Sequence, residues 1–291
     1  MPAVTGPRLG AAIALLLLGA SQSALAECGA RTPAGRYGPN RAFAVSNALV
    51  YSSAMLKVDA DGAPDAYRVD GRGLSYTCDG VVAVENGIRY TPESHPSTWQ
   101  AKCNAGWAAA RQSGDYSRLD IFGFETRRGV PLVQGAGDPL PGVGFVSATS
   151  VTIPGQPADT QRRYVNANEI PYVVLPSGFV TSRSVRPGAV AAVYRPRSGR
   201  LAFAVYGDGG GRLDEASIRL HVDLGSDPII VRNGVRRAKR NIEDRVLVAL
   251  FPGVAPPMSV DAAAWRAAIA AAGAQAFDAW GGRARLEECT N

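Results

Sequence analysis

Histidine is nearly absent from this chain of 291 residues, which contains only two. His95 and His221 lie far apart, and no Cys-x-x-Cys pair accompanies them, so the ligand spacing of a zinc site is missing. The Gly-x-Ser-x-Gly turn of serine hydrolases is missing too, and neither histidine lies in the setting of a nucleophile. These absences argue against zinc chemistry and Ser–His catalysis, and we expect no metal and no cofactor.

Long apolar runs are scarce as well. The candidate, Ala11 to Leu18, is too short to cross a bilayer as a helix. It follows Arg8, the only charged side chain among the first 26 residues, and an Ala-Leu-Ala sequence ends at Ala26. This pattern is typical of a secretory signal peptide cleaved after Ala26. We therefore predict a signal peptide over residues 1–26 and one exported domain over residues 27–291, secreted or periplasmic and free of the membrane.

Charge of one sign is too weakly concentrated to indicate a nucleic-acid-binding protein. The formal net charge is +6, and it falls to +5 without residues 1–26, which carry one arginine and no acid. The most basic segment, Arg232 to Arg240, is followed at once by Glu243 and Asp244. This order favours a solvated loop or arm over a contact with a polyanion. We expect no nucleic-acid partner, and a monomer.

The chain contains four cysteines, an even number in a chain with an export signal, which indicates two disulfides. Three pairings are possible. We favour Cys78 with Cys103, and Cys28 with Cys289, which would tie the two ends of the domain together.

Short apolar runs broken by glycine and proline dominate the rest of the chain, which is typical of a β-rich protein. Residues 170–175 and 246–251 have the composition of buried strands. Residues 189–194 and 201–206 flank a Pro-Arg-Ser-Gly turn and predict a hairpin. The sequence therefore predicts a mainly β fold, with a barrel-like or sandwich-like core.

Two segments have the pattern of helices. Within residues 97–112, Trp99, Cys103 and Trp107 fall on one face, and this stripe suits a core better than a sugar-stacking platform. Residues 259–272 are rich in alanine, with Ser259 as the expected cap and Gly273 as the expected end. We predict two or three helices in total, including one at the C-terminus.

Carboxylates are the groups that remain for chemistry. After the strand at residues 201–206 come Gly207, Asp208 and three glycines, then Asp214 and Glu215 before a second apolar segment. Two acids at the ends of two ordered segments joined by a flexible turn can face each other across a cleft, as glycosidic-bond hydrolysis requires. A solvated hairpin turn is the alternative, and spacing alone favours it.

A second group of acids lies within residues 58–67, where Asp59, Asp61 and Asp65 surround a glycine and a proline. Asp59 and Asp61 would point to the same face of a strand. The segment begins like a calcium loop but lacks the later ligands and the closing glutamate. It is therefore either an acidic turn or a set of carboxylates on the substrate side of a site.

These acidic segments resemble the chitosanases of glycoside hydrolase family 75. The resemblance rests on three blocks that occur in the family's order, residues 55–62, 170–177 and 189–217. Residues 246–253 also resemble a late strand of the family. The third block is the most specific, because a strand, a Gly-Asp step, a glycine-rich turn and a Glu-Ala-Ser step occur together. Three features depart from the family: the seven-residue step from Asp208 to Glu215 is short, Gly209 follows Asp208, and residues 63–160 show little likeness.

The resemblance implies an inverting glycosidase with Asp208 and Glu215 as the catalytic pair. We assign Glu215 as the general acid and Asp208 as the general base. The acids expected to line a cleft for a cationic polysaccharide are Asp59, Asp61, Asp65 and Asp214. The expected function is a secreted endo-glycosidase that hydrolyses β-1,4 bonds in chitosan or a related aminosugar polymer. The alternatives are a non-catalytic secreted protein that binds glycan or cell wall, and a secreted β protein with no glycan role.

Overall fold

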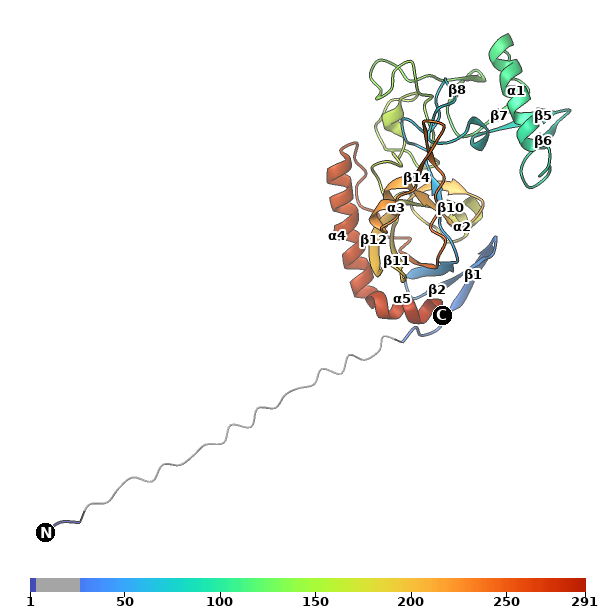
Figure 1. Cartoon of the computed structure of the whole chain (residues 1–291). Coiled ribbons are helices and arrows are strands. Elements are labelled where there is room, and N and C mark those ends of the chain that lie inside the picture. Colours follow the sequence, from blue (N-terminus) through green and yellow to red (C-terminus); the bar gives the residue numbers. More distant parts are fainter. Residues whose placement is uncertain (4–26) are drawn as a thin grey trace.

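A curled, nine-stranded sheet forms the centre of the molecule (Figure 1). This computed structural model describes residues 1–3 and 27–291, so the predicted signal peptide lies almost entirely outside the described residues. The strands of the sheet are arranged in the order β1-β2-β3-β16-β11-β12-β10-β13-β4. Within the described part of the chain, no helix is both long and apolar enough to span a bilayer.

The strands of this sheet come from both ends and the middle of the sequence. Their bounds are β1 Thr32–Tyr37, β2 Asn40–Val45, β3 Ala48–Ser53, β4 Lys57–Asp59, β10 Tyr172–Pro176, β11 Val190–Arg195, β12 Arg200–Gly210, β13 Glu215–Ser217 and β16 Val246–Leu250. The predicted hairpin is confirmed, because β11 and β12 pair antiparallel from Val190 opposite Val205 to Arg195 opposite Arg200. Strand β10 runs parallel to β12 on one side and antiparallel to β13 on the other.

The mainly β fold is confirmed, and five α-helices accompany it in the described residues. Their bounds are α1 Trp99–Ser113, α2 Ser177–Ser182, α3 Ile218–Asp223, α4 Ala262–Trp280 and α5 Gly282–Thr290. Helices α1 and α4 correspond to the helices predicted at residues 97–112 and 259–272, and a further helix, α5, follows α4 at the C-terminus. The short helices α2 and α3 were not predicted, because six residues are too few for a helical period to show in a sequence.

Helix α4 begins and ends later than the sequence predicts. Its N-cap is Asp261, whose side chain accepts from two backbone N–H groups of the first turn, and it ends at Gly281 in a left-handed conformation. Gly273 lies inside the helix rather than at its end. A Cβ at Gly273 would come within 2.7 Å of Phe203 on β12, so this glycine permits close packing of α4 on the sheet.

A lobe formed by residues 60–171 extends from one end of the sheet (Figure 1). It contains α1, a three-stranded sheet and a small hairpin; the bounds are β5 Val81–Glu85, β6 Ile88–Tyr90, β7 Leu119–Ile121, β8 Thr126–Arg127 and β9 Val130–Pro131. Trp107 of α1 packs edge-on against Phe124 and Phe145. The helical stripe at Trp99, Cys103 and Trp107 therefore belongs to the core, as predicted.

Two disulfides link the cysteines in the predicted pairs. Cys78–Cys103 joins the short 3-10 helix Thr77–Asp79, which precedes β5, to α1 inside the lobe. Cys28–Cys289 joins the residues before β1 to α5. The second bond holds the ends of the described domain side by side, and disulfides of this kind are typical of proteins that fold outside a reducing cytosol.

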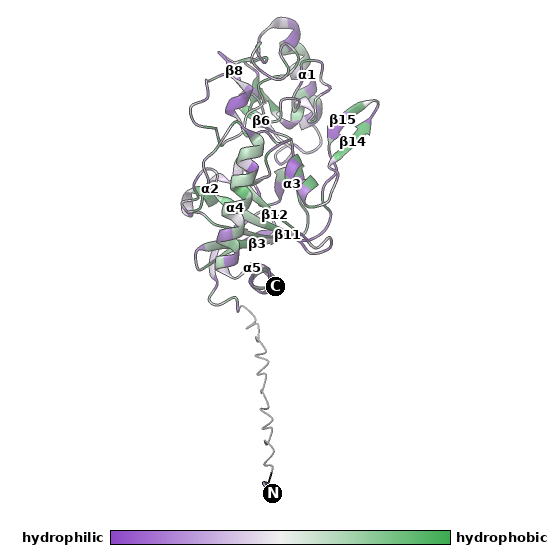
Figure 2. Cartoon of the chain, turned by 90° about the vertical axis from the view of Figure 1, so that its left-hand side faces the viewer, coloured by the Kyte–Doolittle hydropathy of each residue, from purple (hydrophilic) through white to green (hydrophobic). Residues whose placement is uncertain are grey.

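The basic segment forms a two-stranded ribbon, β14 Ile229–Arg232 and β15 Val235–Ala238, which stands away from the body (Figure 2). The prediction of a solvated arm fits its outer part, where Val231 is 69% exposed. Arg237 differs, because it is buried and donates hydrogen bonds to the carbonyl oxygens of Gly71, Gly73 and Ser75. The ribbon is thereby anchored to the lobe at its base.

Candidate active site

An open cleft of about 520 Å³ lies between the sheet and the lobe. Its floor contains the ends of β4, β10, β12 and β13, and its far wall comes from the lobe and from the base of the ribbon. The residues lining it include four acids of the predicted site, namely Asp59, Asp61, Asp208 and Glu215. Asp59 and Asp208, which are about 150 positions apart in the sequence, therefore line the same cleft.

Asp208 lies inside β12, and it is only 6% exposed. One of its oxygens, Oδ1, accepts from the backbone N–H groups of Ser150, at 2.6 Å, and Gly209, at 2.7 Å. The sequence predicts a strand that ends before Asp208 and a flexible glycine turn after it. The structure instead continues β12 through Gly210, because pairing with β10 extends to Pro176 opposite Gly210.

Gly210 shows why small residues follow Asp208. A Cβ at this position would lie 2.7 Å from Cγ1 of Val174 on β10 and 3.4 Å from Oε2 of Glu215. The glycine lets β12 run close to β10 while leaving room for the Glu215 carboxylate. Gly211, one residue later, has no neighbouring atom within 4 Å of the same hypothetical carbon. The glycine run therefore has a packing role at Gly210 that it lacks at Gly211.

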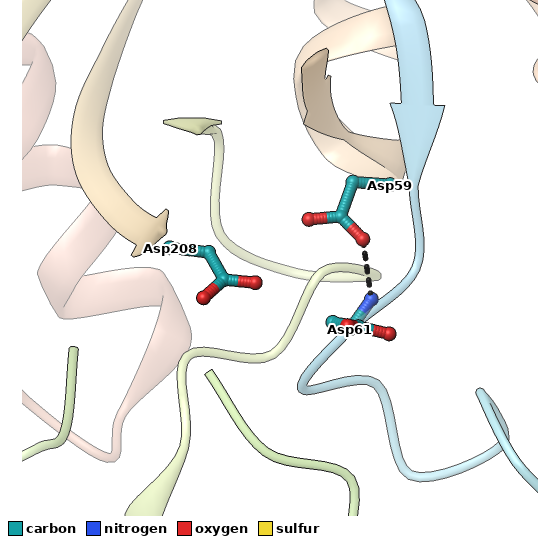
Figure 3. A group of neighbouring side chains, drawn as sticks. All are labelled: Asp59, Asp61 and Asp208. Carbon is teal, nitrogen blue, oxygen red and sulfur yellow. Dashed lines mark hydrogen bonds between the residues drawn. The ribbon is translucent and has the colours of Figure 1, made fainter. Parts of the chain in front are cut away.

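Asp59 and Asp208 face each other from strands that are not neighbours (Figure 3). Asp59 ends β4, and Asp208 lies on β12, with β13 and β10 between them. Backbones three strands apart in a flat sheet would be about 14 Å apart. Asp59, Asp61 and Asp208 nevertheless each bring one carboxylate oxygen within 4.8 Å of the others. The curl of the sheet is what brings the two acidic segments of the sequence together.

Hydrogen bonds fix the orientation of Asp59. Its Oδ1 accepts from the backbone N–H of Asp61 at 2.9 Å, and its Oδ2 accepts from the hydroxyl of Tyr172 at 3.0 Å. The same hydroxyl lies 2.9 Å from the carbonyl oxygen of Asp61. Tyr172 is fully buried at the start of β10, so it connects the floor of the sheet to the acidic segment.

The acids of the cleft hold protons more tightly than exposed carboxyl groups do. Burial, followed by the charge of Asp208, raises the pKa of Asp59 to about 7. Burial raises the pKa of Asp208 to about 6, although the N–H groups of Ser150 and Gly209 act in the opposite direction. Burial and the charges of Asp59 and Asp208 raise the pKa of Asp61 as well. Three carboxyl groups this close repel one another when ionised, so the cluster retains a proton near neutral pH.

Glu215 has a more open environment. It begins β13, its side chain is 33% exposed, and its Oε1 lies 3.7 Å from Nζ of Lys57. Burial and Asp59 raise its pKa, whereas the Lys57 ammonium lowers it. Glu215 therefore combines solvent access with a neighbouring cation, as does Asp79 in the wall of the cleft, which pairs with Lys239 at 2.7 Å.

Two acids expected in the cleft lie elsewhere. Asp65 lines a different pocket, beside Arg68 and Arg72, and accepts a hydrogen bond from Asn168 at 2.8 Å. Asp214 is fully buried behind the turn from β12 to β13, where Nε of Arg212 donates to it at 2.9 Å. Because successive residues of an extended chain point to opposite sides, Asp214 points away from the cleft when Glu215 points into it.

Several residues of the cleft could not be found from the sequence. Ser150, Tyr172 and Lys57 contact the acids only because the chain folds back from distant positions. Phe122 is 52% exposed and lines the cleft, so its ring is available to a ligand there. Lys57 and Tyr172 lie in the sequence blocks 55–62 and 170–177, but nothing in those blocks assigns them a role, and no motif marks Ser150 or Phe122.

The cluster of Asp59, Asp61 and Asp208 has oxygen atoms spaced closely enough to surround a cation. Acidic groups of this kind are common in proteins that bind no ion, and no other feature of these residues points to one. His221 is not a candidate ligand, because it is fully buried and its two ring nitrogens lie 3.0 Å and 3.1 Å from the carbonyl oxygens of Ser217 and Leu56.

The chain matches no protein-family model, and a search of curated proteins found no match. The resemblance to the chitosanases therefore rests on the sequence blocks described above, and the chemistry of the cleft rests on its own geometry.

Proposed function

We propose that this protein is an exported endo-glycosidase that hydrolyses chitosan or a related aminosugar polymer with Asp208 and Glu215 as its catalytic pair. The observation that carries the proposal is the presence of both acids in one open cleft, on strands that flank β10. Their strands are two spacings apart, which is about 10 Å between backbones in a flat sheet. An inverting reaction requires the two carboxyl groups to lie about 6.5–9.5 Å apart, on opposite faces of the sugar, with a water between one of them and the ring.

The surroundings of the two acids support a division of roles opposite to the one assigned from the sequence. Asp208 is nearly buried and belongs to a cluster that retains a proton, which suits a general acid. Glu215 is more exposed and lies beside Lys57, which suits an ionised general base. In this reaction Asp208 protonates the leaving glycosidic oxygen, while Glu215 removes a proton from the attacking water.

The substrate class follows from the charge and shape of the cleft. Asp59 and Asp61 place carboxylates next to the reaction centre, where they can accept hydrogen bonds from the ammonium group of a glucosamine unit. Phe122 offers an exposed ring that can cover the apolar face of a neighbouring sugar. The opening of the cleft to solvent suits a long chain that is cut internally. A net positive protein can bind such a cation because the local field of the cleft governs the contact.

Export is part of the proposal. Two disulfides fit an oxidising compartment, and the polymer proposed as substrate lies outside the cytoplasm. We propose that the protein works in the periplasm or outside the cell, as a monomer.

The test is an assay of new reducing ends with chitosan as substrate. The parent should cleave, whereas Asp208→Asn and Glu215→Gln should each lose activity by at least about a hundredfold and keep their fold and their affinity for the polymer. Asp65→Asn, a carboxylate outside the cleft, is the matched control and should stay active. A parent that binds chitosan but cleaves neither it, chitin nor peptidoglycan would be a glycan-binding protein; a parent that does not bind at all would contradict both functions.

A further inference from the structure

A buried carboxylate lies directly behind Glu215 and takes no part in the cleft. Asp214 is fully buried, and its Oδ2 accepts from Arg212. Its other oxygen, Oδ1, is also buried, yet it receives no hydrogen bond from any described residue. The ammonium of Lys57, at 3.8 Å, is the cation within ion-pair distance of that oxygen. A buried carboxylate oxygen without a hydrogen bond is costly, so Lys57 stabilises the Oδ1 side of Asp214 while Arg212 stabilises the Oδ2 side.

Lys57 is held between Asp214 and Glu215 by the backbone. It lies opposite Glu215 in the parallel pairing of β4 with β13, and its backbone N–H donates to the carbonyl oxygen of Asp214 at 2.7 Å. Its Nζ is 3.7 Å from Oε1 of Glu215 and 3.8 Å from Oδ1 of Asp214. One ammonium group is therefore shared by an acid in the cleft and an acid in the interior.

The charged groups around Glu215 act in opposite directions. They come from β4, from β12 and from the turn before β13: Lys57, Asp59, Asp208, Arg212 and Asp214. Among the described residues, Lys57 is the one cation within ion-pair distance of the Glu215 carboxylate. Burial and the neighbouring acids favour a protonated Glu215, and Lys57 opposes them.

We propose that Lys57 is a positioning residue, which the buried Asp214 holds in place and which keeps Glu215 ionised while Asp208 keeps its proton. The inference rests on the proposed function, because it explains how one cleft can present a general acid and a general base at the same pH. Lys57 acts on the reaction through Glu215 and forms no bond to the substrate.

Replacing Lys57 alone is not a sufficient test. Lys57→Met leaves the buried Oδ1 of Asp214 without a cation, although Arg212 still pairs with Oδ2, and it lowers the stability of the fold. A second comparison is therefore between Asp214→Asn and the double variant Lys57→Met/Asp214→Asn, which differ only at Lys57 and contain no carboxylate at position 214. Lys57→Arg is the conservative variant, and Lys102→Met, which breaks a surface ion pair with Glu85, is the matched control.

The first readout is independent of activity. The carboxyl carbon of Glu215 is followed by NMR as the pH is raised, with Asp208→Asn as the common background. The midpoint for Glu215 should lie at least about half a pH unit higher in the double variant than in Asp214→Asn. Lys57→Arg and Lys102→Met should leave the midpoint unchanged. Lys57→Met with Asp214 intact, checked for folding, should raise the midpoint above that of the Asp208→Asn background by at least the same amount. Equal midpoints in both comparisons overturn the proposal.

The second readout is the pH dependence of kcat/KM on chitosan, measured with Asp208 intact. In the double variant, the acid-side limb of the pH profile should move to higher pH, relative to Asp214→Asn, by the same amount as the NMR midpoint of Glu215. The alkaline limb should not move. Lys57→Arg should have the profile of the parent. A moved NMR midpoint with an unmoved kinetic limb would overturn the catalytic role of Lys57. A parent without activity would contradict the proposed function alone, because the NMR titration still measures the effect of Lys57 on Glu215.

Discussion

Asp59 and Asp208 bring carboxylate oxygens within 4.8 Å of each other although β13 and β10 separate their strands. The hydrogen bonds that Asp59 accepts come from a backbone N–H group and a tyrosine hydroxyl, and neither donor is a cation. The pair therefore has consequences for stability as well as for chemistry.

The stability of the protein should fall as the pH rises from about 4 to about 7. The pKa of Asp59 is raised to about 7 and that of Asp208 to about 6, so the folded state binds more protons than the unfolded state in this window. Stability linked to these groups is greatest below the unfolded pKa and is lost as the pH approaches the folded pKa. Urea unfolding at several pH values measures the effect. Asp59→Asn should flatten the dependence, and Asp227→Asn, an exposed acid, should leave it unchanged.

Phe122→Ala should weaken substrate binding with little effect on the chemical step. The ring is half exposed at the edge of the cleft, and covering it with a sugar removes apolar surface from water. We expect KM for chitosan oligomers to rise about tenfold, which corresponds to about 1.4 kcal/mol, while kcat changes little. Phe122→Trp should retain binding. An unchanged KM in the alanine variant would show that sugars do not contact this side of the cleft.

Gly210→Ala should impair both stability and activity, whereas Gly211→Ala should affect neither. The added carbon at Gly210 would overlap Val174 and approach the Glu215 carboxylate, but at Gly211 it meets open space. Overpacking of this kind costs about 1–3 kcal/mol. Thermal unfolding and the reducing-end assay on the two variants check the difference. Equal behaviour of the two variants would mean that β12 does not pack tightly on β10 at this point.

Loss of the Cys28–Cys289 disulfide should destabilise the protein more than loss of Cys78–Cys103. The two bonds close loops of 261 and 25 residues. Loop-closure entropy then gives about 5.5 and about 3.5 kcal/mol respectively. Paired serine variants, compared by chemical unfolding with the parent, measure both values. The reverse order would indicate that residual structure in the unfolded chain, rather than loop length, determines the effect.

The local elements were the part of the fold that could be predicted from the sequence. The β11–β12 hairpin, the buried strands β10 and β16, and the core stripe of α1 follow from turn chemistry and periodicity. The end of α4 was wrong by eight residues, from Ala272 to Trp280, because Gly273 permits packing on Phe203 and does not end the helix. A sequence cannot distinguish a glycine that ends a helix from one that a neighbouring ring requires.

The site could be predicted only in part, because the contacts that a residue makes in the folded chain cannot be read from its neighbours in the sequence. Asp59, Asp61, Asp208 and Glu215 meet in one cleft, but Asp214 and Asp65 do not reach it. The curl of the sheet, which brings Asp59 to Asp208, depends on packing between distant segments. Lys57 and Tyr172 lie in the resemblance blocks 55–62 and 170–177, but their contacts with the acids depend on that curl and could not be predicted from the blocks.

The Cys28–Cys289 bond also determines how the molecule can be attached to other structures. Both ends of the described domain lie at the pole opposite the lobe that contains α1 (Figure 1). A tether attached at either end would extend from that pole. The lobe, which forms one wall of the cleft, would then face away from the point of attachment. The protein can therefore be immobilised or fused through one end, or cyclised through both, while a long polymer still has access to its acids.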